Sequence, residues 1–273
     1  MSPIITMEEV DGRTIRVARW ISGKNDHLPI LFFNGIGANL ELIAPLAEKL
    51  AERDMITFDM PGIGGSPDPA VPYRPWMMAR IADLLLDRFG YDKVDVMGIS
   101  WGGGLAQQYG LQCGARVNKL ILVATSAGML MVPGKISALS KMADPRRYID
   151  PDFMLKNFKK LYGGGEDGAT GHVDRITPPS KMGYFYQMFA MIGWTSAFWL
   201  PMMRPETLIM MGDEDNIVPL ANGKILKALI PNSRLEVIKG GGHLFLMAEA
   251  DLCVRLIRGF LDDSIVVPIR KAA

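Results

Sequence analysis

The chain has 273 residues, of which 49% are hydrophobic, so it can form one large α/β domain or a domain that carries an insertion. Its 30 basic and 29 acidic residues leave a formal net charge of +1, which argues against sequence-independent binding to nucleic acid. The two cysteines, Cys113 and Cys253, are too few for a disulfide framework or a metal cluster, so we expect no metal. The N-terminus lacks the features of a signal peptide, which favours a cytoplasmic protein.

Strands and helices are predicted to alternate along most of the chain. Two strands joined by an Asp11-Gly12 turn come first. The elements that follow are strand 29–33, helix 40–53, strand 55–58, helix 74–89, strand 94–97, helix 105–111, strand 120–124, strand 207–211, helix 220–230, strand 235–238 and helix 246–261. This alternation predicts right-handed crossovers and a mostly parallel sheet with helices on both faces.

The alternation pauses after the sixth strand. We interpret residues 127–204 as a helical cap inserted over the C-terminal edge of the sheet, where α/β proteins bind ligands, and residues 1–126 and 205–273 as the core. Residues 182–203 of the cap are apolar and uncharged. Their length would suit a membrane span, but glycine, glutamine and proline interrupt them and they lie between two strands of one sheet, so we predict no transmembrane segment.

The stretch Gly98-Ile99-Ser100-Trp101-Gly102 matches the G-x-S-x-G pattern between a strand and a helix. A nucleophilic serine must stand on a sharp turn so that its hydroxyl projects above the sheet. Only residues without a Cβ are expected to fit at Gly98 and Gly102, because neighbouring chains pass close to this turn. The pattern therefore predicts that Ser100 is a catalytic nucleophile.

A serine hydroxyl needs an adjacent base, and only three histidines can supply it. His27 precedes strand 29–33, at the end of the sheet opposite the serine turn. His172 lies in a polar, Gly-rich part of the insertion. His243 follows the last strand on a loop at the correct end, so elimination identifies His243 as the base.

The base needs a carboxylate that orients it. The turn after strand 207–211 offers Asp213, Glu214 and Asp215. We select Asp215, because a carboxylate a few residues past the strand can reach the neighbouring loop; Asp213 is the alternative and is otherwise expected to order the turn. The order Ser100, Asp215, His243 is that of α/β-hydrolases.

Acyl transfer also needs hydrogen-bond donors for the developing oxyanion. We expect the backbone N–H of Trp101, directly after the nucleophile, and that of Ile36 in the Gly-rich turn after strand 29–33. Asp59 and Ser66 are expected to order their own turn instead of contacting substrate. The reaction requires no cofactor.

Seven short motifs resemble the intracellular medium-chain-length poly(3-hydroxyalkanoate) depolymerases. The motifs are Asn34-Gly35-Ile36-Gly37-Ala38-Asn39, Gly98-Ile99-Ser100-Trp101-Gly102-Gly103, Met131-Val132-Pro133-Gly134-Lys135, Pro145-Arg146-Arg147-Tyr148, Lys181-Met182-Gly183-Tyr184, Gly193-Trp194-Thr195-Ser196 and Gly242-His243-Leu244-Phe245-Leu246. They extend through the cap, and the match is poorest over residues 163–179. The resemblance implies an α/β-hydrolase fold and a serine hydrolase on the surface of cytoplasmic polyester granules, with a triad at Ser100, Asp215 and His243.

The apolar stretch of the cap has two candidate roles besides that of plain cap core. It can frame an acyl pocket, since methionine and aromatic side chains adapt to aliphatic chains, or it can face an apolar granule. The candidate pocket residues are Asn34, Met182, Trp194, Phe198 and Trp199.

The leading hypothesis is hydrolysis of medium-chain-length poly(3-hydroxyalkanoate) ester bonds through an acyl-serine intermediate. A hydrolase of small esters or of C–C bonds on the same frame is an alternative, and so is a granule- or ligand-binding protein that retains the fold. Epoxide hydrolases and haloalkane dehalogenases are disfavoured, because they use aspartate where this chain has Ser100. The oligomeric state is not predicted.

Overall fold

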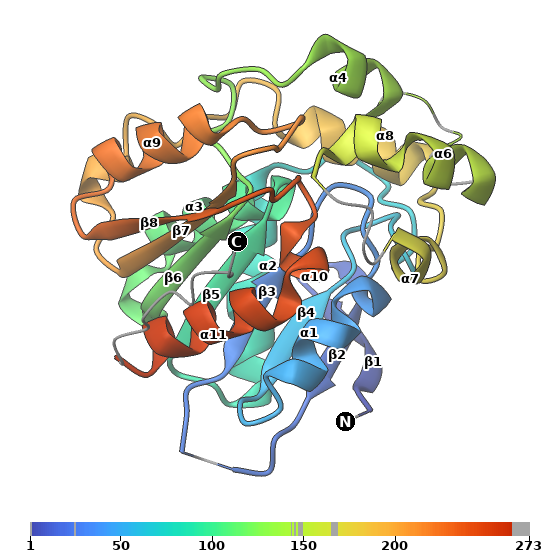
Figure 1. Cartoon of the computed structure of the whole chain (residues 1–273). Helices are drawn as coiled ribbons and strands as arrows, with labels where there is room; N and C mark the ends of the chain where they lie inside the picture. The colour runs from blue at the N-terminus through green and yellow to red at the C-terminus, as the bar shows by residue number, and fades with distance from the viewer. Residues whose placement is uncertain are drawn as a thin grey trace.

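An eight-stranded sheet lies at the centre of the molecule (Figure 1). The strands are β1 (Ile4–Val10), β2 (Arg13–Trp20), β3 (Ile30–Phe33), β4 (Met55–Phe58), β5 (Val94–Ile99), β6 (Val117–Val123), β7 (Glu206–Gly212) and β8 (Ser233–Ile238). Their order is β1-β2-β4-β3-β5-β6-β7-β8. β2 pairs antiparallel with β1 and with β4, and the remaining pairs are parallel. The predicted mostly parallel sheet is therefore confirmed.

The computed structural model describes residues 2–24, 26–142, 144, 146, 150–164 and 169–263. Three residues of one motif quoted above, Pro145, Arg147 and Tyr148, lie outside the described residues, as do residues 165–168 of the poorly matching stretch.

Helices follow most strands, and two of the predicted helices are divided. The helices of the core are η1 (Leu40–Ile43), α1 (Ala44–Lys49), α2 (Pro75–Phe89), α3 (Trp101–Gln112), η2 (Gly114–Arg116), α9 (Leu220–Leu229), α10 (Phe245–Ala248) and α11 (Ala250–Leu261). The predicted helix 40–53 is a 3₁₀ turn followed by α1, because Pro45 lacks an amide hydrogen and starts a new helix. The predicted helix 246–261 is divided at Glu249, whose ψ of 40° departs from helical geometry.

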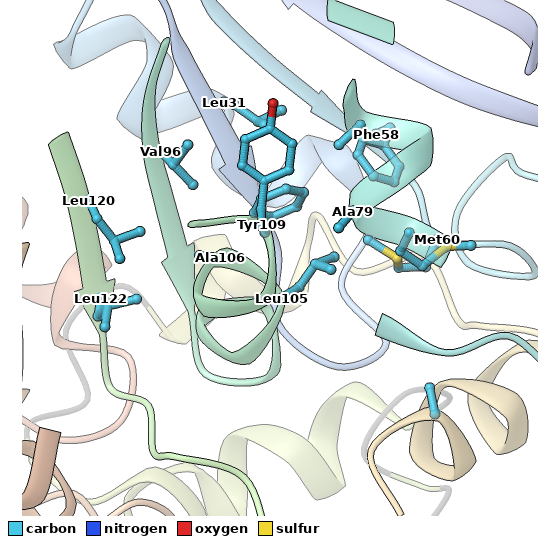
Figure 2. Packing of buried hydrophobic residues seen from close by; sticks show 14 of the residues in the cluster. Leu31, Phe58, Met60, Ala79, Val96, Leu105, Ala106, Tyr109, Leu120 and Leu122 are labelled. Atoms are coloured by element: carbon cyan, nitrogen blue, oxygen red, sulfur yellow. The ribbon is translucent and has the colours of Figure 1, made fainter. Parts of the chain in front are cut away.

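Each face of the sheet is covered by its own apolar core. One core joins the sheet to α2, α3 and α9, and the other joins it to α1, α10 and α11. Figure 2 shows part of the first core, in which Leu105, Ala106 and Tyr109 of α3 pack beside Val96 of β5 and Leu120 of β6. Because both faces of the sheet are covered, every residue of β5 is buried. The packing around β5 therefore holds the position of its carboxyl end, which Ser100 follows.

The helices α4 (Ile136–Met142), α6 (Pro151–Tyr162), α7 (Ala169–Val173), α8 (Lys181–Ala190) and η3 (Leu200–Met202) connect β6 to β7. Figure 1 shows α4, α6, α7 and α8 together at one end of the sheet. That end carries the serine turn, since cap residues Met142 and His172 line a pocket with Ser100.

Candidate active site

Ser100 lies at the turn between β5 and α3, with a φ of 55°, which is strained for a residue with a side chain. A Cβ on Gly98 would collide with the carbonyl oxygen of Gly102, and a Cβ on Gly102 with that of Phe33. The expectation that only glycine fits at these two positions is confirmed. The close approach of α3 to the ends of β3 and β5 holds the Ser100 turn in its strained conformation.

His243 lies on the loop after β8, with its ring against Ser100. Its Nε2 is 2.9 Å from Ser100 Oγ. The backbone N–H of His243 donates to the carbonyl oxygen of Tyr162 over 2.7 Å, and the Tyr162 ring lies parallel to the imidazole. Residue 162 of the cap therefore helps to fix the orientation of the imidazole from two directions.

Asp215 lies after β7 and is buried. Its Oδ2 is 2.7 Å from His243 Nδ1, and its Oδ1 accepts the backbone N–H groups of Ile217 and Val218. A carboxylate only accepts hydrogen bonds, so Nδ1 carries the ring hydrogen and Nε2 is left to accept from Ser100 Oγ–H. The hydrogen bonds of Asp215 thus select the tautomer that a general base needs.

The other two acids of this turn lie elsewhere. Asp213 accepts the backbone N–H of Gly240 over 2.7 Å and pairs with Lys239, so it orders the neighbouring turn. Glu214 is exposed. Of the three candidate acids, the structure brings only Asp215 to His243.

The two predicted oxyanion donors flank the nucleophile. A Cβ built on Gly35, next to Ile36, would lie 3.8 Å from the Cβ of Ser100, so this loop contacts the serine turn. Trp101 is the first residue of α3, where backbone N–H groups have no acceptor within the helix. The role of the Ile36 and Trp101 N–H groups as oxyanion donors remains a prediction.

Two mainly apolar pockets meet at Ser100, and Ile36 lines both. The first, with a cavity volume of about 80 Å³, lies on the His243 side, and the second, with a cavity volume of about 320 Å³, lies on the Trp101 side. Apolar side chains of the first include Leu42, Ile99, Met142, Ile176 and Met247. Those of the second include Met129, Met131, Leu139, Met191 and Trp194. A branched ester can therefore place apolar groups on both sides of the nucleophile.

The structure brings two of the five predicted pocket residues to these pockets. Asn34 lines the first and donates through Nδ2 to the carbonyl oxygen of Asn39 over 3.0 Å. Trp194 lines the second and donates through Nε1 to Gln108 Oε1 over 2.9 Å. Asn34 is thus a loop anchor, and Trp194 is a wall of the second pocket.

For the other three residues the pocket prediction is corrected. Met182, Phe198 and Trp199 line neither pocket, and they are 46%, 73% and 58% exposed. The buried face of α8 runs through Gly183 and Gln187, so Met182 lies on the opposite face of the helix.

The cap also supplies pocket residues that sequence reasoning missed. His172, which was placed from the sequence in a polar, Gly-rich part of the insertion and rejected as the base, lines the first pocket together with Tyr162. No local signal could identify them, because their position depends on how α6 and α7 fold over the sheet.

A buried charge network supports the loop that precedes α1. Asp59 accepts the backbone N–H groups of Gly65 and Leu40 and pairs with Arg16. Ser66 Oγ donates to the Asp59 carbonyl oxygen, so the prediction that Asp59 and Ser66 order their own turn is confirmed. Burial raises the pKa of Asp59 to about 6, although the two backbone donors and Arg16 act to lower it.

Among the described residues, no group of three or more His, Cys, Asp or Glu side chains could hold a metal ion. No helix in that part of the chain is long and apolar enough to cross a membrane.

A strained serine after a central strand, a histidine after the last strand and a parallel sheet with a helical insertion define a class of hydrolases. The family described as alpha/beta hydrolase fold matches residues 29–162 and 174–250. The chain belongs to this family and is a hydrolase.

Within the family, the chain is 43% identical over 261 residues to a poly(3-hydroxyalkanoate) depolymerase of Ectopseudomonas oleovorans, covering 94% of this chain and 92% of that protein. The resemblance predicted from the motifs is thereby confirmed. The chain is 29% identical to a 2-hydroxymuconate semialdehyde hydrolase of Pseudomonas putida over 78% of each protein. Among solved structures, an esterase from Exiguobacterium antarcticum matches with a TM-score of 0.78 and 25% identity, covering 96% of this chain and all of that one.

Proposed function

We propose that this chain hydrolyses ester bonds of a medium-chain-length poly(3-hydroxyalkanoate) through an acyl-serine intermediate. The observation that carries the reaction is the hydrogen-bonded series Asp215–His243–Ser100, with distances of 2.7 and 2.9 Å. The identity to the depolymerase and the two apolar pockets beside Ser100 support the choice of a polyester with aliphatic side chains.

The reaction proceeds in two stages, acylation of Ser100 and hydrolysis of the acyl-serine, with His243 oriented by Asp215 in both. Ser100 Oγ attacks the ester carbonyl while His243 Nε2 takes its proton, and the N–H groups of Ile36 and Trp101 bind the oxyanion. Collapse of this intermediate breaks the C–O bond of the ester, and His243 returns the proton to the departing 3-hydroxyl oxygen. Water then attacks the acyl-Ser100 with His243 again as the base, which releases a carboxylic acid and restores Ser100.

In this proposal residues 127–204 act as a cap that closes the site and shapes both pockets. A polymer substrate carries an alkyl side chain on each side of the scissile ester, so one pocket takes the acyl unit and the other the unit that leaves. Mainly apolar linings favour such side chains by burial, at about 0.8 kcal/mol for each methylene.

We also propose that the cap rests on the polyester granule. The apolar rim, defined as Met129, Leu130, Met182, Phe185, Met188, Phe189 and Ile192, consists of large side chains between 37% and 61% exposed. Five of them form one stripe along α8 and the residue positions just after it. The backbone N–H of Met129 donates to the Trp194 carbonyl oxygen, and both of these residues line the second pocket. Exposed apolar area of this kind favours an apolar partner.

The test compares turnover of purified polymer granules with that of soluble p-nitrophenyl esters, with Ser100→Ala as the inactive control. Release of 3-hydroxy acids from granules by the wild type and not by the variant is the expected result. Turnover of soluble esters alone would indicate a small-ester hydrolase, and cleavage of a 2-hydroxymuconate semialdehyde would favour the C–C bond hydrolase.

A further inference from the structure

Gln187 of α8 joins the cap to both sides of the nucleophile. Its side chain is fully buried. Its Oε1 accepts the backbone N–H of Gly37 over 2.8 Å, and its own carbonyl oxygen accepts the indole N–H of Trp101 over 3.0 Å. One residue of the cap thus holds two segments of the core that are 64 positions apart in the chain.

These two segments supply the proposed oxyanion donors. Gly37 directly follows Ile36, so the bond from Gly37 fixes the peptide plane next to the Ile36 amide. The indole of Trp101 belongs to the residue whose backbone N–H is the second donor. A shift of either segment would move a donor, and donors act only within about 0.3 Å of their best distance to the oxyanion.

The side-chain amide of Gln187 is oriented so that its acceptor, Oε1, is used and its donor, Nε2, is not used by any described residue. Within the described part of the chain, its buried Nε2 has no hydrogen-bond partner. An unsatisfied buried donor costs about 1–3 kcal/mol. Turning the amide over would remove the acceptor from the Gly37 N–H, so the observed orientation keeps that bond at the expense of the donor.

A second contact between cap and core lies at the other end of the same loop. The side chain of Asn39, which is fully buried, donates to the carbonyl oxygen of Arg175 and accepts the N–H of Thr177, each over 3.0 Å. Loop 34–39 is therefore attached to the cap at Gly37 and at Asn39, and Gln187 is the attachment nearer to the donors.

We propose that Gln187 is a positioning residue that sets the geometry of the oxyanion hole from the cap. This inference rests on the proposed function, because it requires Ile36 and Trp101 to bind the oxyanion. Loss of the Oε1 acceptor lets the Gly37 peptide rotate, and the Ile36 donor leaves its place. This loss raises the free energy of the transition state, in which the carbonyl oxygen is charged, and changes the affinity for the uncharged substrate little.

The test substitutes Gln187→Met, which keeps the length of the side chain and removes the acceptor. We expect kcat for p-nitrophenyl octanoate to fall about 10- to 100-fold while KM changes less than about threefold. Affinity for an alkyl trifluoromethyl ketone, whose tetrahedral adduct places an oxygen in the hole, falls by the same factor. Affinity for the corresponding plain alcohol does not change. Gln187→Glu retains an oxygen acceptor and recovers most of kcat.

Gln107 provides a matched control. It is also a fully buried glutamine that joins the cap to α3, since its Oε1 accepts from Ser196 Oγ and its Nε2 donates to the Gly103 and Ser126 carbonyls. Gln107→Met should lower the free energy of unfolding and leave the ratio of ketone to alcohol affinity at its wild-type value.

An unchanged ratio in Gln187→Met, or an equal change in both methionine variants, overturns the inference while the wild type remains an esterase. A wild type that hydrolyses no ester overturns the proposed function itself. If Gln187→Met does not fold, Gln187→Asn, whose amide is one methylene short of Gly37, replaces it with the same expected results.

Discussion

The catalytic series and the cap are built in opposite ways. Ser100, Asp215 and His243 lie one to five residues after β5, β7 and β8, so the ends of three strands of one sheet determine their separation. The pockets beside them are completed by cap helices, of which α4 and α7 have seven and five residues. The sheet therefore fixes the separation of the three catalytic side chains, whereas a part of the chain that packs against the sheet sets the size and apolar character of the pockets.

This difference assigns reaction and specificity to different regions. A change at the strand ends should abolish turnover of every ester. A change in the cap away from Tyr162, which contacts His243, should alter which ester is preferred or act on the oxyanion hole through Gln187. Such a change should leave the hydrogen bonds among Ser100, His243 and Asp215 unchanged.

The largest expected effect is at the strand ends. Ser100→Ala or His243→Ala should lower kcat on any ester on the order of 10⁴-fold or more, because the members of such a series act as a unit. Asp215→Asn should cost somewhat less. Steady-state kinetics on p-nitrophenyl octanoate provide the measurement.

Asp213→Asn is the control for the acid, since Asp213 contacts the Gly240 turn and not His243. Near-normal activity of Asp215→Asn beside an inactive Asp213→Asn would show that the wrong carboxylate was chosen.

The next effect is on chain-length preference. Trp194→Leu enlarges the second pocket, so the rise of kcat/KM with chain length should extend to longer esters, by about fourfold for each added methylene that is buried. The measurement is kcat/KM over a series of p-nitrophenyl esters from acetate to dodecanoate.

Phe198→Ser provides the contrast, because Phe198 is 73% exposed and lines neither pocket. Its soluble-ester profile should match the wild type. A changed profile in Phe198→Ser with an unchanged one in Trp194→Leu would reverse the assignment of the two side chains.

A smaller effect concerns the stability of the core loop that holds Asp59. Since the pKa of this buried carboxyl is raised to about 6, the folded chain binds its proton more tightly than the unfolded chain does. Stability from this group is therefore present at low pH and falls as the pH rises through 4 to 6. Relative to Asp59→Asn, the wild type should lose about 1 kcal/mol of unfolding free energy between pH 5 and pH 7. Urea unfolding at both pH values gives this difference, and parallel curves for the two proteins would contradict it.

The smallest effect is expected at the cysteines. Cys113, directly after α3, packs against one core and Cys253 of α11 belongs to the other, on opposite faces of the sheet, and both are free thiols. Burial raises the pKa of each thiol to about 12, so alkylation by iodoacetamide at pH 8 should be slow in the native protein and fast in urea. A Cys113–Cys253 bridge found by mass spectrometry would contradict the placement of these helices.

Local sequence rules predicted the parts of the fold that local geometry determines. The strand–turn–helix at Ser100 requires glycine at two positions, and both are sterically necessary in the structure. Asp215 and His243 could be predicted for a similar reason, since the carboxyl ends of the strands in a parallel sheet lie along one edge. The loop of Asp59 and Ser66 was predicted from turn chemistry.

No comparable local rule predicts which cap residues line the pockets. An apolar composition indicates burial but not what a side chain is buried against, and so Met182, Phe198 and Trp199 were assigned to a pocket that they do not line. His172 and Gln187 reach the site only because the cap folds back over the sheet, a long-range contact without a sequence signature. The boundary of the cap, placed at residues 127 and 204, follows from where the strand pattern stops.

The central claim is that Ser100 forms an acyl intermediate with a 3-hydroxyacyl ester. Rapid acid quenching of the enzyme with p-nitrophenyl 3-hydroxyoctanoate, followed by peptide mass spectrometry, tests it most directly. The account predicts a 3-hydroxyoctanoyl group on the peptide that contains Ser100, formed together with the initial release of p-nitrophenol. An acyl group on another residue, or steady turnover without any acylated peptide, would contradict it.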